Sequence, residues 1–278
     1  MKNTFGTNVL TTIFGESHGP AVGGVLDGLA PGIPVDPEQI KKKLALRRPQ
    51  GQISTSRIEA DEFEIVSGVF ENKTTGTPLC VLIPNQNVRS GDYDAVRDLA
   101  RPGHADYTGF VKYRGFADYR GGGHFSGRVT AALVALGAIA ERALEGRGIG
   151  IGTHISRLAG IPDRGFADLD ADIASLSDRA FPVLDGAAAD KMQAAILKAK
   201  EELDSVGGVL ETVVTGLPAG VGEPWFDSLE GLLSHGLFSI PGVKGVEFGD
   251  GFALAGMRGS EANDPFVPAN GGIFCNNT

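Results

Sequence analysis

The chain has 278 residues, 42% of them hydrophobic, and a formal net charge of -9 at pH 7. This apolar content is ample for a sizeable buried core, and the acidic balance argues against binding to bulk nucleic acid or to an anionic membrane surface. We find no apolar run of 18 residues and no signal-peptide pattern at the N-terminus, so we expect a cytoplasmic protein.

Cysteine usage predicts neither a disulfide framework nor a metal site. Cys80 and Cys275 are the two cysteines, and their spacing does not match that of metal ligands. A site for an anionic ligand in such an acidic chain must therefore be a local pocket.

The N-terminal part predicts two strands, over 4–14 and 21–30, followed by a helix. In "VDPEQIKKKLALRR", Asp36 suits the N-cap, Pro37 the first helical position and Gln39 the capping-box position. Residues 40–58 then contain six basic residues and no acidic one. They are Lys41, Lys42, Lys43, Arg47, Arg48 and Arg57. A solvated helix face explains the lysines as well as a binding role does.

The rest of the chain alternates strands and helices. The expected elements are strands at 63–70 and 77–83, a loop-rich stretch at 85–128, a buried helix at 129–148, a helix at 187–208, a strand at 208–217, a helix at 226–240 capped by Asp227, and a strand-like stretch at 242–252. No linker divides the chain, which predicts a single domain over residues 1–278.

One internal similarity links residues 68–78, "GVFENKTTGTP", to residues 208–218, "GVLETVVTGLP". Strand and turn chemistry common to both stretches explains the shared letters. The alternative is a pseudo-duplicated unit, and different topologies in the two stretches would remove that reading.

The first stretch with residues suited to binding or catalysis is "GESHGP". Ser17 and His18 lie between Gly15 and Gly19, in a turn where backbone amides can approach an anion. An exposed histidine without function is the plainer reading of His18 taken alone.

The second stretch is residues 101–128, "RPGHADYTGFVKYRGFADYRGGGHFSGR". Arginine binds carboxylate and phosphate bidentately, but Asp106 and Asp118 make ordinary ion pairing an alternative. The segment "RGGGHFSGR", just before the expected buried helix, is typical of a backbone nest that favours phosphate. It is neither a P-loop nor a dinucleotide fingerprint. The four arginines are Arg101, Arg114, Arg120 and Arg128.

These residues together predict a pocket that contains several arginines, two or three histidines and no metal. Its ligand should carry phosphate and carboxylate groups together, and the histidines can donate protons near neutral pH.

Three stretches resemble chorismate synthase: "GESHGP", "RPGHADYTGFVKYRGFADYRGGG" and "FSIPGVKGVEFGDGF". The resemblance covers essentially the whole chain, in order. It implies a 1,4-trans elimination of phosphate from 5-enolpyruvylshikimate 3-phosphate to give chorismate, with reduced FMN as cofactor. It also implies an α+β fold, a β-α-β sandwich with helices between antiparallel sheets and a pseudo-two-fold internal repeat, assembled as a homotetramer.

The resemblance also implies roles for particular residues. His18 would protonate the departing phosphate, and His104 would lie near the flavin. Ser17 and Ser126 match serines of a proton relay. The substrate-binding set is Arg48, Arg57, Arg101 and Arg128, with either Arg47 or Arg48 facing inward. The flavin-binding set is His124, Phe125, Ser126, Pro241 and Gly242.

The chain departs from the family in two places. His124 stands where many members have arginine, which removes one anion contact. The chain reaches "GGIFCNNT" where members continue with further flavin contacts and a late Arg-His-Asp motif. We therefore expect these 278 residues by themselves to bind FMN weakly, to turn over slowly or not at all, and to expose an apolar face.

Two other functions stay open: a non-catalytic binder of anions or flavin, and an unrelated phosphosugar lyase or transferase. Release of phosphate under anaerobic reducing conditions separates the first from the enzyme, and an FMN requirement separates the second. An external flavin reductant is expected, and reduction by NADPH within the protein is left open.

Overall fold

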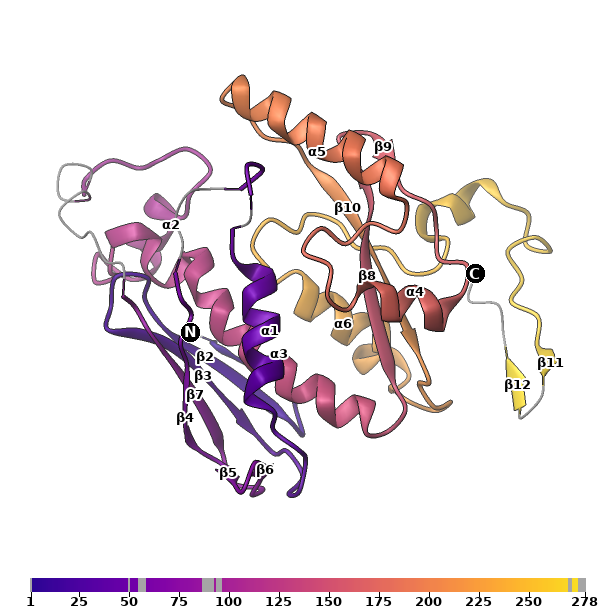
Figure 1. The fold of residues 1–278 in the computed structure, drawn as a ribbon, viewed down its shortest axis with the longest axis horizontal. Helices are drawn as coiled ribbons and strands as arrows, with labels where there is room; N and C mark the ends of the chain where they lie inside the picture. The colour runs from indigo at the N-terminus through magenta and orange to yellow at the C-terminus, as the bar shows by residue number, and fades with distance from the viewer. Residues whose placement is uncertain are drawn as a thin grey trace. The chain divides into compact units, whose positions relative to one another are not determined.

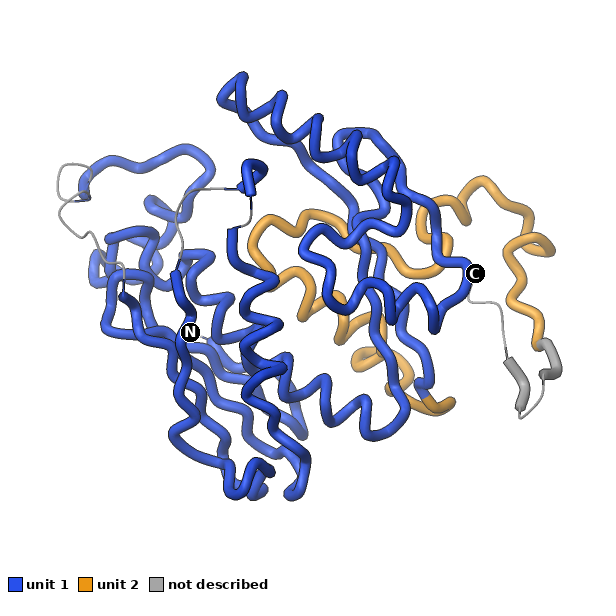
Figure 2. The backbone as a smooth tube through the Cα atoms, viewed as in Figure 1, with its two compact units in different colours: residues 1–217 blue, residues 218–278 orange. Residues whose placement is uncertain are grey.

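The computed structural model describes residues 2–49, 51–54, 59–86, 93, 97–269 and 272–274. The chain divides into two compact units, Met1–Leu217 and Pro218–Thr278 (Figure 2). The single domain expected from the sequence stays a prediction, because two compact units can belong to one domain or to two.

An antiparallel five-stranded sheet, in the order β1-β2-β3-β7-β4, forms the first half of unit 1 (Figure 1). Its strands are β1 (Thr4–Phe5), β2 (Leu10–Gly15), β3 (Ala21–Asp27), β4 (Glu64–Ser67) and β7 (Leu79–Pro84). The small strands β5 (Val69–Phe70) and β6 (Lys73–Thr74) form a separate hairpin.

Two of the expected strands are interrupted. Residues 4–14 form two strands that pair with each other, because the chain turns back after Gly6, whose φ is +107°. Residues 63–70 break at Gly68, whose φ is +83°. A glycine with positive φ ends the extended run in both places, which the alternation of apolar residues does not reveal.

The first helix begins as its sequence predicts. α1 (Pro37–Arg47) has Asp36 as N-cap, and the Asp36 carboxylate accepts hydrogen bonds from the backbone N–H groups of Glu38 and Gln39 at 2.9 and 3.4 Å. Ile40 and Leu44 are its buried residues. The helix therefore presents its basic C-terminal end, Arg47, at a position set by this apolar side.

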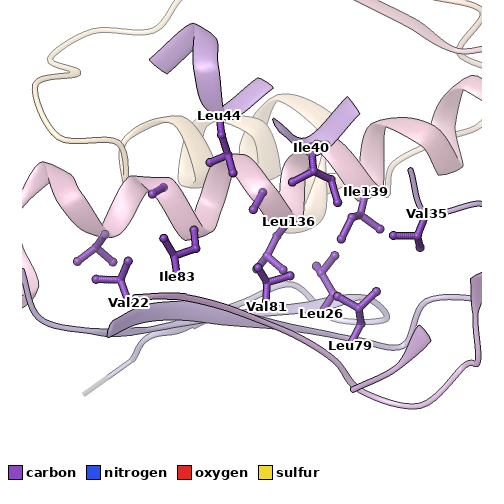
Figure 3. Packing of buried hydrophobic residues seen from close by; sticks show 14 residues of the cluster. Val22, Leu26, Val35, Ile40, Leu44, Leu79, Val81, Ile83, Leu136 and Ile139 are labelled. Carbon is purple, nitrogen blue, oxygen red and sulfur yellow. The ribbon is translucent and has the colours of Figure 1, made fainter. Parts of the chain in front are cut away.

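The helix α3 (Thr130–Glu145) packs between α1 and the sheet, as predicted for a buried helix. Figure 3 shows Leu136 and Ile139 of α3 close to Leu26, Leu79 and Val81 of the strands. Two 3₁₀ segments, η2 (Arg120–Phe125) and η3 (Gly127–Val129), lead into α3. Burial of this apolar layer supplies the hydrophobic stabilisation of the half that carries the candidate site.

Two helices, α2 and α4 (Leu169–Leu176), were not expected. α2 (Asp106–Lys112) lies within the stretch expected to be loop-rich. It has only seven residues, and its Gly109 packs against the ring of Phe125. Since glycine disfavours helix, the contact with Phe125 rather than intrinsic propensity explains the helix at this point.

The second half of unit 1 has its own antiparallel sheet, in the order β10-β8-β9, with two helices (Figure 1). A small core of Val183, Ala188 and Met192 joins α5 to this sheet. The helix α5 ends at Glu201, before the predicted end at 208, and Leu203 follows with a φ of +56°. The elements are β8 (Gly150–Leu158), β9 (Ile161–Pro162), α4 (Leu169–Leu176), α5 (Gly186–Glu201) and β10 (Gly208–Thr215).

The two similar stretches adopt different structures. Residues 68–78 contain the β5–β6 hairpin, with Glu71 and Asn72 at positive φ, whereas residues 208–215 form the continuous strand β10. The offset of 140 residues therefore does not relate equivalent elements, and shared strand and turn chemistry explains the matching letters.

Unit 2 contains short elements and no buried residue among those whose side chains are described. α6 is capped by Ser228, whose Oγ accepts a hydrogen bond from Gly231 N–H at 3.1 Å, and not by Asp227 as predicted. Residues 242–250 form no strand, and η5 follows. The elements are η4 (Trp225–Asp227), α6 (Leu229–Leu237), η5 (Gly251–Gly256), β11 (Val267–Ala269) and β12 (Gly272–Phe274).

The structure thus has mixed α+β architecture with antiparallel sheets, as predicted. Within the described parts of the chain, no helix has the length and apolar character needed to cross a membrane.

Candidate functional site

The turn between β2 and β3 carries Ser17 and His18, and both side chains are buried. Ser17 Oγ lies 3.2 Å from the carbonyl oxygen of Arg120 and 3.0 Å from that of Gly121, to which it donates. Its backbone N–H donates to the carbonyl oxygen of Gly123 at 3.1 Å. The turn is therefore attached to the glycine triplet, although the two are about a hundred residues apart in sequence.

The triplet Gly121, Gly122 and Gly123 has positive φ at every position, with values of 59°, 86° and 54°. A Cβ on Gly121 would lie 2.4 Å from Cδ2 and 2.5 Å from Nε2 of His18, whereas a Cβ on Gly122 would have its nearest neighbour at 3.8 Å. Gly121 is thus required both by its backbone conformation and by the close approach of the His18 ring.

His18 is 5% exposed, and this number separates it from the idle surface histidine that was the alternative reading. Its ring meets the ring of Tyr93 edge to face, with centroids 4.9 Å apart. Hydrogen bonds from Arg120 lower the pKa of the nearby Asp118 carboxyl, and the charge of His18 adds a smaller effect in the same direction. His18 therefore lies in a pocket of mixed aromatic and ionic character.

Asn85, which follows β7, connects this turn to Arg128. Its Nδ2 donates to the carbonyl oxygens of Glu16 and Gly19 at 2.9 and 2.8 Å, and its Oδ1 accepts from Arg128 Nε at 2.9 Å. Arg128 lies in η3, at the entrance to α3. One amide side chain therefore holds both ends of the histidine turn and one face of a guanidinium group.

The carboxylate of Asp61 forms salt bridges with three arginines. It pairs with the buried Arg128, with Arg47 NH1 at 2.9 Å, and with Arg48 Nε at 3.8 Å. The Asp61 side chain is fully buried, and Glu59 Oε2 lies 3.0 Å from Arg128 Nε. Because three guanidinium groups face two carboxylates, the cluster keeps an excess of positive charge that favours an anionic neighbour.

Arg47 and Arg48 are the more exposed arginines of this cluster, with 22% and 32% of their side chains accessible. Both line a cavity of about 870 Å³ together with the 51–54 loop and part of α5. Lys200 of α5 donates to the carbonyl oxygens of Gln52 and Ser54 at 2.6 and 3.2 Å, which holds that loop. The sequence left open whether Arg47 or Arg48 faces the substrate; in the structure both line this cavity and both contact Asp61, and the choice between them stays a prediction.

Arg101 and His104 lie together at the start of α2. Arg101 donates to both carboxylate oxygens of Asp106, at 2.8 and 2.9 Å, and these hydrogen bonds lower the pKa of Asp106 to about 2. His104 is exposed, and its backbone N–H donates to the carbonyl oxygen of Arg101 at 3.3 Å. The ion pairing that was the alternative reading of the arginines thus applies to Arg101.

The residues expected to bind flavin begin at the end of the glycine triplet. Nδ1 of His124 donates to the carbonyl oxygen of Gly15 at 2.8 Å, and the half-exposed ring of Phe125 meets Tyr113 at 5.9 Å between centroids. Ser126 Oγ accepts from the backbone N–H of Arg128 at 3.2 Å. His124 and Ser126 therefore belong to the same hydrogen-bonded region as His18.

Arg57 falls outside the described residues, and Pro241 and Gly242 belong to unit 2, where Gly242 has a φ of +92°. Among the described residues, no group of three or more His, Cys, Asp or Glu side chains could hold a metal ion.

Sequence reasoning missed the acceptors of the cluster, Glu59 and Asp61, and the connecting Asn85. The signal for the first two was present, because the acidic run "EADE" follows directly after the basic stretch 40–58. Asn85 carried no such signal, since its partners lie at 16, 19 and 128.

Comparison with known proteins places these features in one family. A family model described as chorismate synthase matches residues 9–277. The chorismate synthase of Methanosarcina mazei is 45% identical over 274 residues, which is 98% of this chain and 74% of that protein. The chorismate synthase of Dehalococcoides mccartyi is 47% identical over 269 residues, or 96% and 73% of the two chains.

A solved structure gives the same result. A crystal structure of chorismate synthase superposes with a TM-score of 0.79 at 28% identity, covering 98% of this chain and 77% of that one. The similarity in sequence extends over nearly the whole chain and is accompanied by similarity of fold. The chain belongs to the chorismate synthase family.

Proposed function

We propose that this chain eliminates phosphate from 5-enolpyruvylshikimate 3-phosphate to form chorismate, and that the region around His18 and the Asp61 cluster is where it does so. The observation that carries the proposal is the attachment of the His18 turn, through Asn85, to the buried Arg128. A proton donor and an arginine-rich anion site are thereby parts of one hydrogen-bonded region.

The substrate carries one phosphate and two carboxylates, so its confinement needs surrounding cations. Arg48, together with Arg47, would supply them from the rim of the cluster, because both keep accessible surface. Arg57 and Arg101 are proposed as further contacts. Arg101 would then exchange part of its pairing with Asp106 for the ligand.

The departing phosphate needs a proton, and His18 is the proposed donor. Its ring is fixed by the backbone of Gly121 on one edge and by Tyr93 on another, so little reorientation is needed when the phosphate leaves. His104, exposed at the start of α2, is proposed as the second histidine, next to the cofactor.

Two serines have complementary roles in this proposal. The Ser17 hydroxyl hydrogen is directed at the carbonyl oxygens of Arg120 and Gly121, so its oxygen can accept a proton. Ser126 Oγ accepts the N–H of Arg128, so its own hydrogen can be donated. Both serines are proposed as members of a proton relay, in which the Ser17 hydroxyl would have to turn away from the two carbonyl oxygens to pass a proton on.

The residues present fit reduced FMN, which would supply electron density that weakens the allylic carbon–oxygen bond. Gly103 and Gly127 have no atom within 4 Å of where a Cβ would lie, and the half-exposed Phe125 offers an aromatic face. His124, Phe125 and Ser126 would hold the cofactor, and Pro241 and Gly242 are proposed as flavin contacts from the family resemblance alone. An external reductant is proposed to supply the electrons.

The finer architecture belongs to the proposal as well: a sandwich with helices between two antiparallel sheets, related by a pseudo-two-fold repeat, in a homotetramer. Two parts of unit 1 support it. In residues 2–145, α3 contacts the antiparallel sheet and α1 contacts α3; in residues 150–215, α4 and α5 contact the second antiparallel sheet. Superposition of the two halves in an experimental structure, and sedimentation of the protein, would test it. Cytoplasmic location stays a prediction.

The test is phosphate release from 5-enolpyruvylshikimate 3-phosphate with reduced FMN under anaerobic conditions, followed together with chorismate absorbance. Both signals should appear at equal rates and vanish when reduced FMN is omitted. Calorimetric titration with the substrate provides a readout that does not need turnover, and Arg48→Ala should weaken binding by about 1.5–3 kcal/mol, the value of a charge-assisted bond. Binding without phosphate release would identify a non-catalytic binder instead.

A further inference from the structure

Arg128 has little capacity left for a ligand. Its Nε contacts Asn85 Oδ1 at 2.9 Å and Glu59 Oε2 at 3.0 Å, NH1 pairs with Asp61, and NH2 donates to the carbonyl oxygen of Pro84 at 3.2 Å. Every nitrogen of this guanidinium group therefore has a protein acceptor. Since only 6% of the side chain is exposed, Arg128 faces the protein rather than a substrate.

The acceptors of Arg128 lead in two directions. Through Asn85 they lead to the carbonyl oxygens of Glu16 and Gly19, which flank Ser17 and His18. Through Asp61 they lead to Arg47 and Arg48 at the C-terminal end of α1. The connected side chains thus span the distance between the proton donor and the rim arginines without a break.

We propose that Asn85, Arg128 and Asp61 are positioning residues, which together fix the His18 turn relative to the guanidinium groups of Arg47 and Arg48. This inference rests on the proposed function only for the roles of His18 and the rim arginines. Asn85 is its central member, because it contacts both the turn and Arg128 at 2.8–2.9 Å.

The physical basis is that a buried ion pair contributes little stability compared with apolar side chains of the same size, but it specifies geometry. Asp61 also has a φ of +51°, an uncommon conformation for a residue other than glycine. A backbone held in that conformation directs one carboxylate to three guanidinium groups. Misplacement of a reacting group by about 1 Å can cost 100-fold in rate, so such a frame matters for turnover more than for affinity.

The first experiment substitutes Asn85→Asp. The new carboxylate keeps its shape and can still accept from Arg128, but when ionised it cannot donate to Glu16 and Gly19. Asn72→Asp is the matched control, because Asn72 is exposed in the β5–β6 turn and receives the same chemical change. Turnover of Asn85→Asp should fall by about 30-fold or more, KM for the substrate should change by less than about threefold, and Asn72→Asp should match the parent chain.

A second readout does not depend on activity. The pH titration of the His18 ring, followed by NMR of histidine-labelled protein, should shift in Asn85→Asp and stay unchanged in Asn72→Asp. A parent chain without turnover would count against the proposed function, while this titration would still decide the positioning role. If Asn85→Asp does not fold, Asn85→Ser removes the same amide donors with a smaller side chain.

The network is tested by combining Asn85→Ser with Asp61→Asn. If both residues act through Arg128, their effects on turnover should not multiply, and the double variant should be about as slow as the slower single variant. Independent effects that multiply would overturn the network. A rise in KM as the main effect of Asn85→Asp, or an unchanged His18 titration, would overturn the positioning role.

Discussion

Two histidines of unit 1, His18 and His154, are both buried, yet they lie in opposite surroundings. His154 is completely buried on β8, where its Nδ1 lies 2.8 Å from Asp163 Oδ2 and its Nε2 lies 2.7 Å from Glu211 Oε2. Glu211 is its direct cross-strand partner on β10. His18 instead occupies a turn against Gly121 and Tyr93, close to a cluster with excess arginine.

Burial by itself therefore does not distinguish the proposed proton donor His18 from His154, whereas their neighbours do. Both ring nitrogens of His154 lie within hydrogen-bond distance of a carboxylate oxygen, so protein groups hold the ring on both sides. Such a ring joins β8, β10 and the loop at Asp163, and it has no site for exchange with a substrate. The His18 ring instead contacts an aromatic ring, that of Tyr93, and lies against the glycine triplet.

The largest expected effect is on turnover. His18→Ala should lower the anaerobic rate of phosphate release by about 100- to 10,000-fold, the range for loss of a general acid. Substrate affinity by calorimetry should stay close to that of the parent chain, because the arginines are untouched. A variant that keeps full turnover would remove His18 from the chemistry.

The reverse pattern is expected for the other histidine. His154→Ala should lower the free energy of unfolding by about 3 kcal/mol, because it leaves a cavity and removes a buried hydrogen-bond partner of Asp163. Urea unfolding measures this loss. The rate per folded molecule should be unchanged, and a selective loss of turnover would mean that His154 takes part in the reaction.

Substitutions in the glycine triplet test whether close contact with the His18 ring matters for turnover. Gly121→Ala and Gly122→Ala both place a side chain at positive φ, which costs about 1–2 kcal/mol each. Only Gly121→Ala also forces a Cβ to 2.4 Å from the His18 ring, so it should lose about 100-fold in turnover while Gly122→Ala loses far less. Equal losses in both variants would mean that backbone strain alone is responsible.

The smallest effect concerns acid stability near His154. Burial by itself would raise the pKa of Asp163, but hydrogen bonds from the backbone of Leu184 and Asp185 and from His154 lower it overall. A carboxyl with a depressed pKa contributes stability above its ordinary value of about 3.9, and that stability is lost as the pH falls through the folded-state pKa. Asp163→Asn should therefore show a smaller drop in unfolding free energy between about pH 5 and pH 2 than the parent chain. An equal drop in both proteins would assign the acid sensitivity to other groups.

Local patterns in the sequence were enough for several elements. Asp36 and Pro37 predicted the start of α1, and the apolar content of 129–148 predicted the buried helix α3, because capping and periodicity act within a few residues. The glycine triplet likewise predicted an unusual backbone conformation before α3. The motif that identified the family, "GESHGP", contains the histidine turn itself.

Contacts between distant segments decided the rest. The interruption of the first strand at Gly6, the short helix α2 against Phe125, and the cap at Ser228 depend on neighbours or on dihedral choices that a residue pattern does not record. The same holds for the pairing of Arg128 with Asp61 and Asn85, which lie 67 and 43 residues away.

Three short motifs by themselves predicted the family, and that resemblance implied the antiparallel α+β class; the arginines and histidines of the predicted anion site were likewise visible as residue types in short segments. Which arginine is enclosed by protein acceptors and which keeps accessible surface follows only from the folded chain. The sequence shows that an arginine is charged but does not show its partners. The acceptors that the fold brings around the guanidinium group determine whether it is available to a ligand or occupied by the protein.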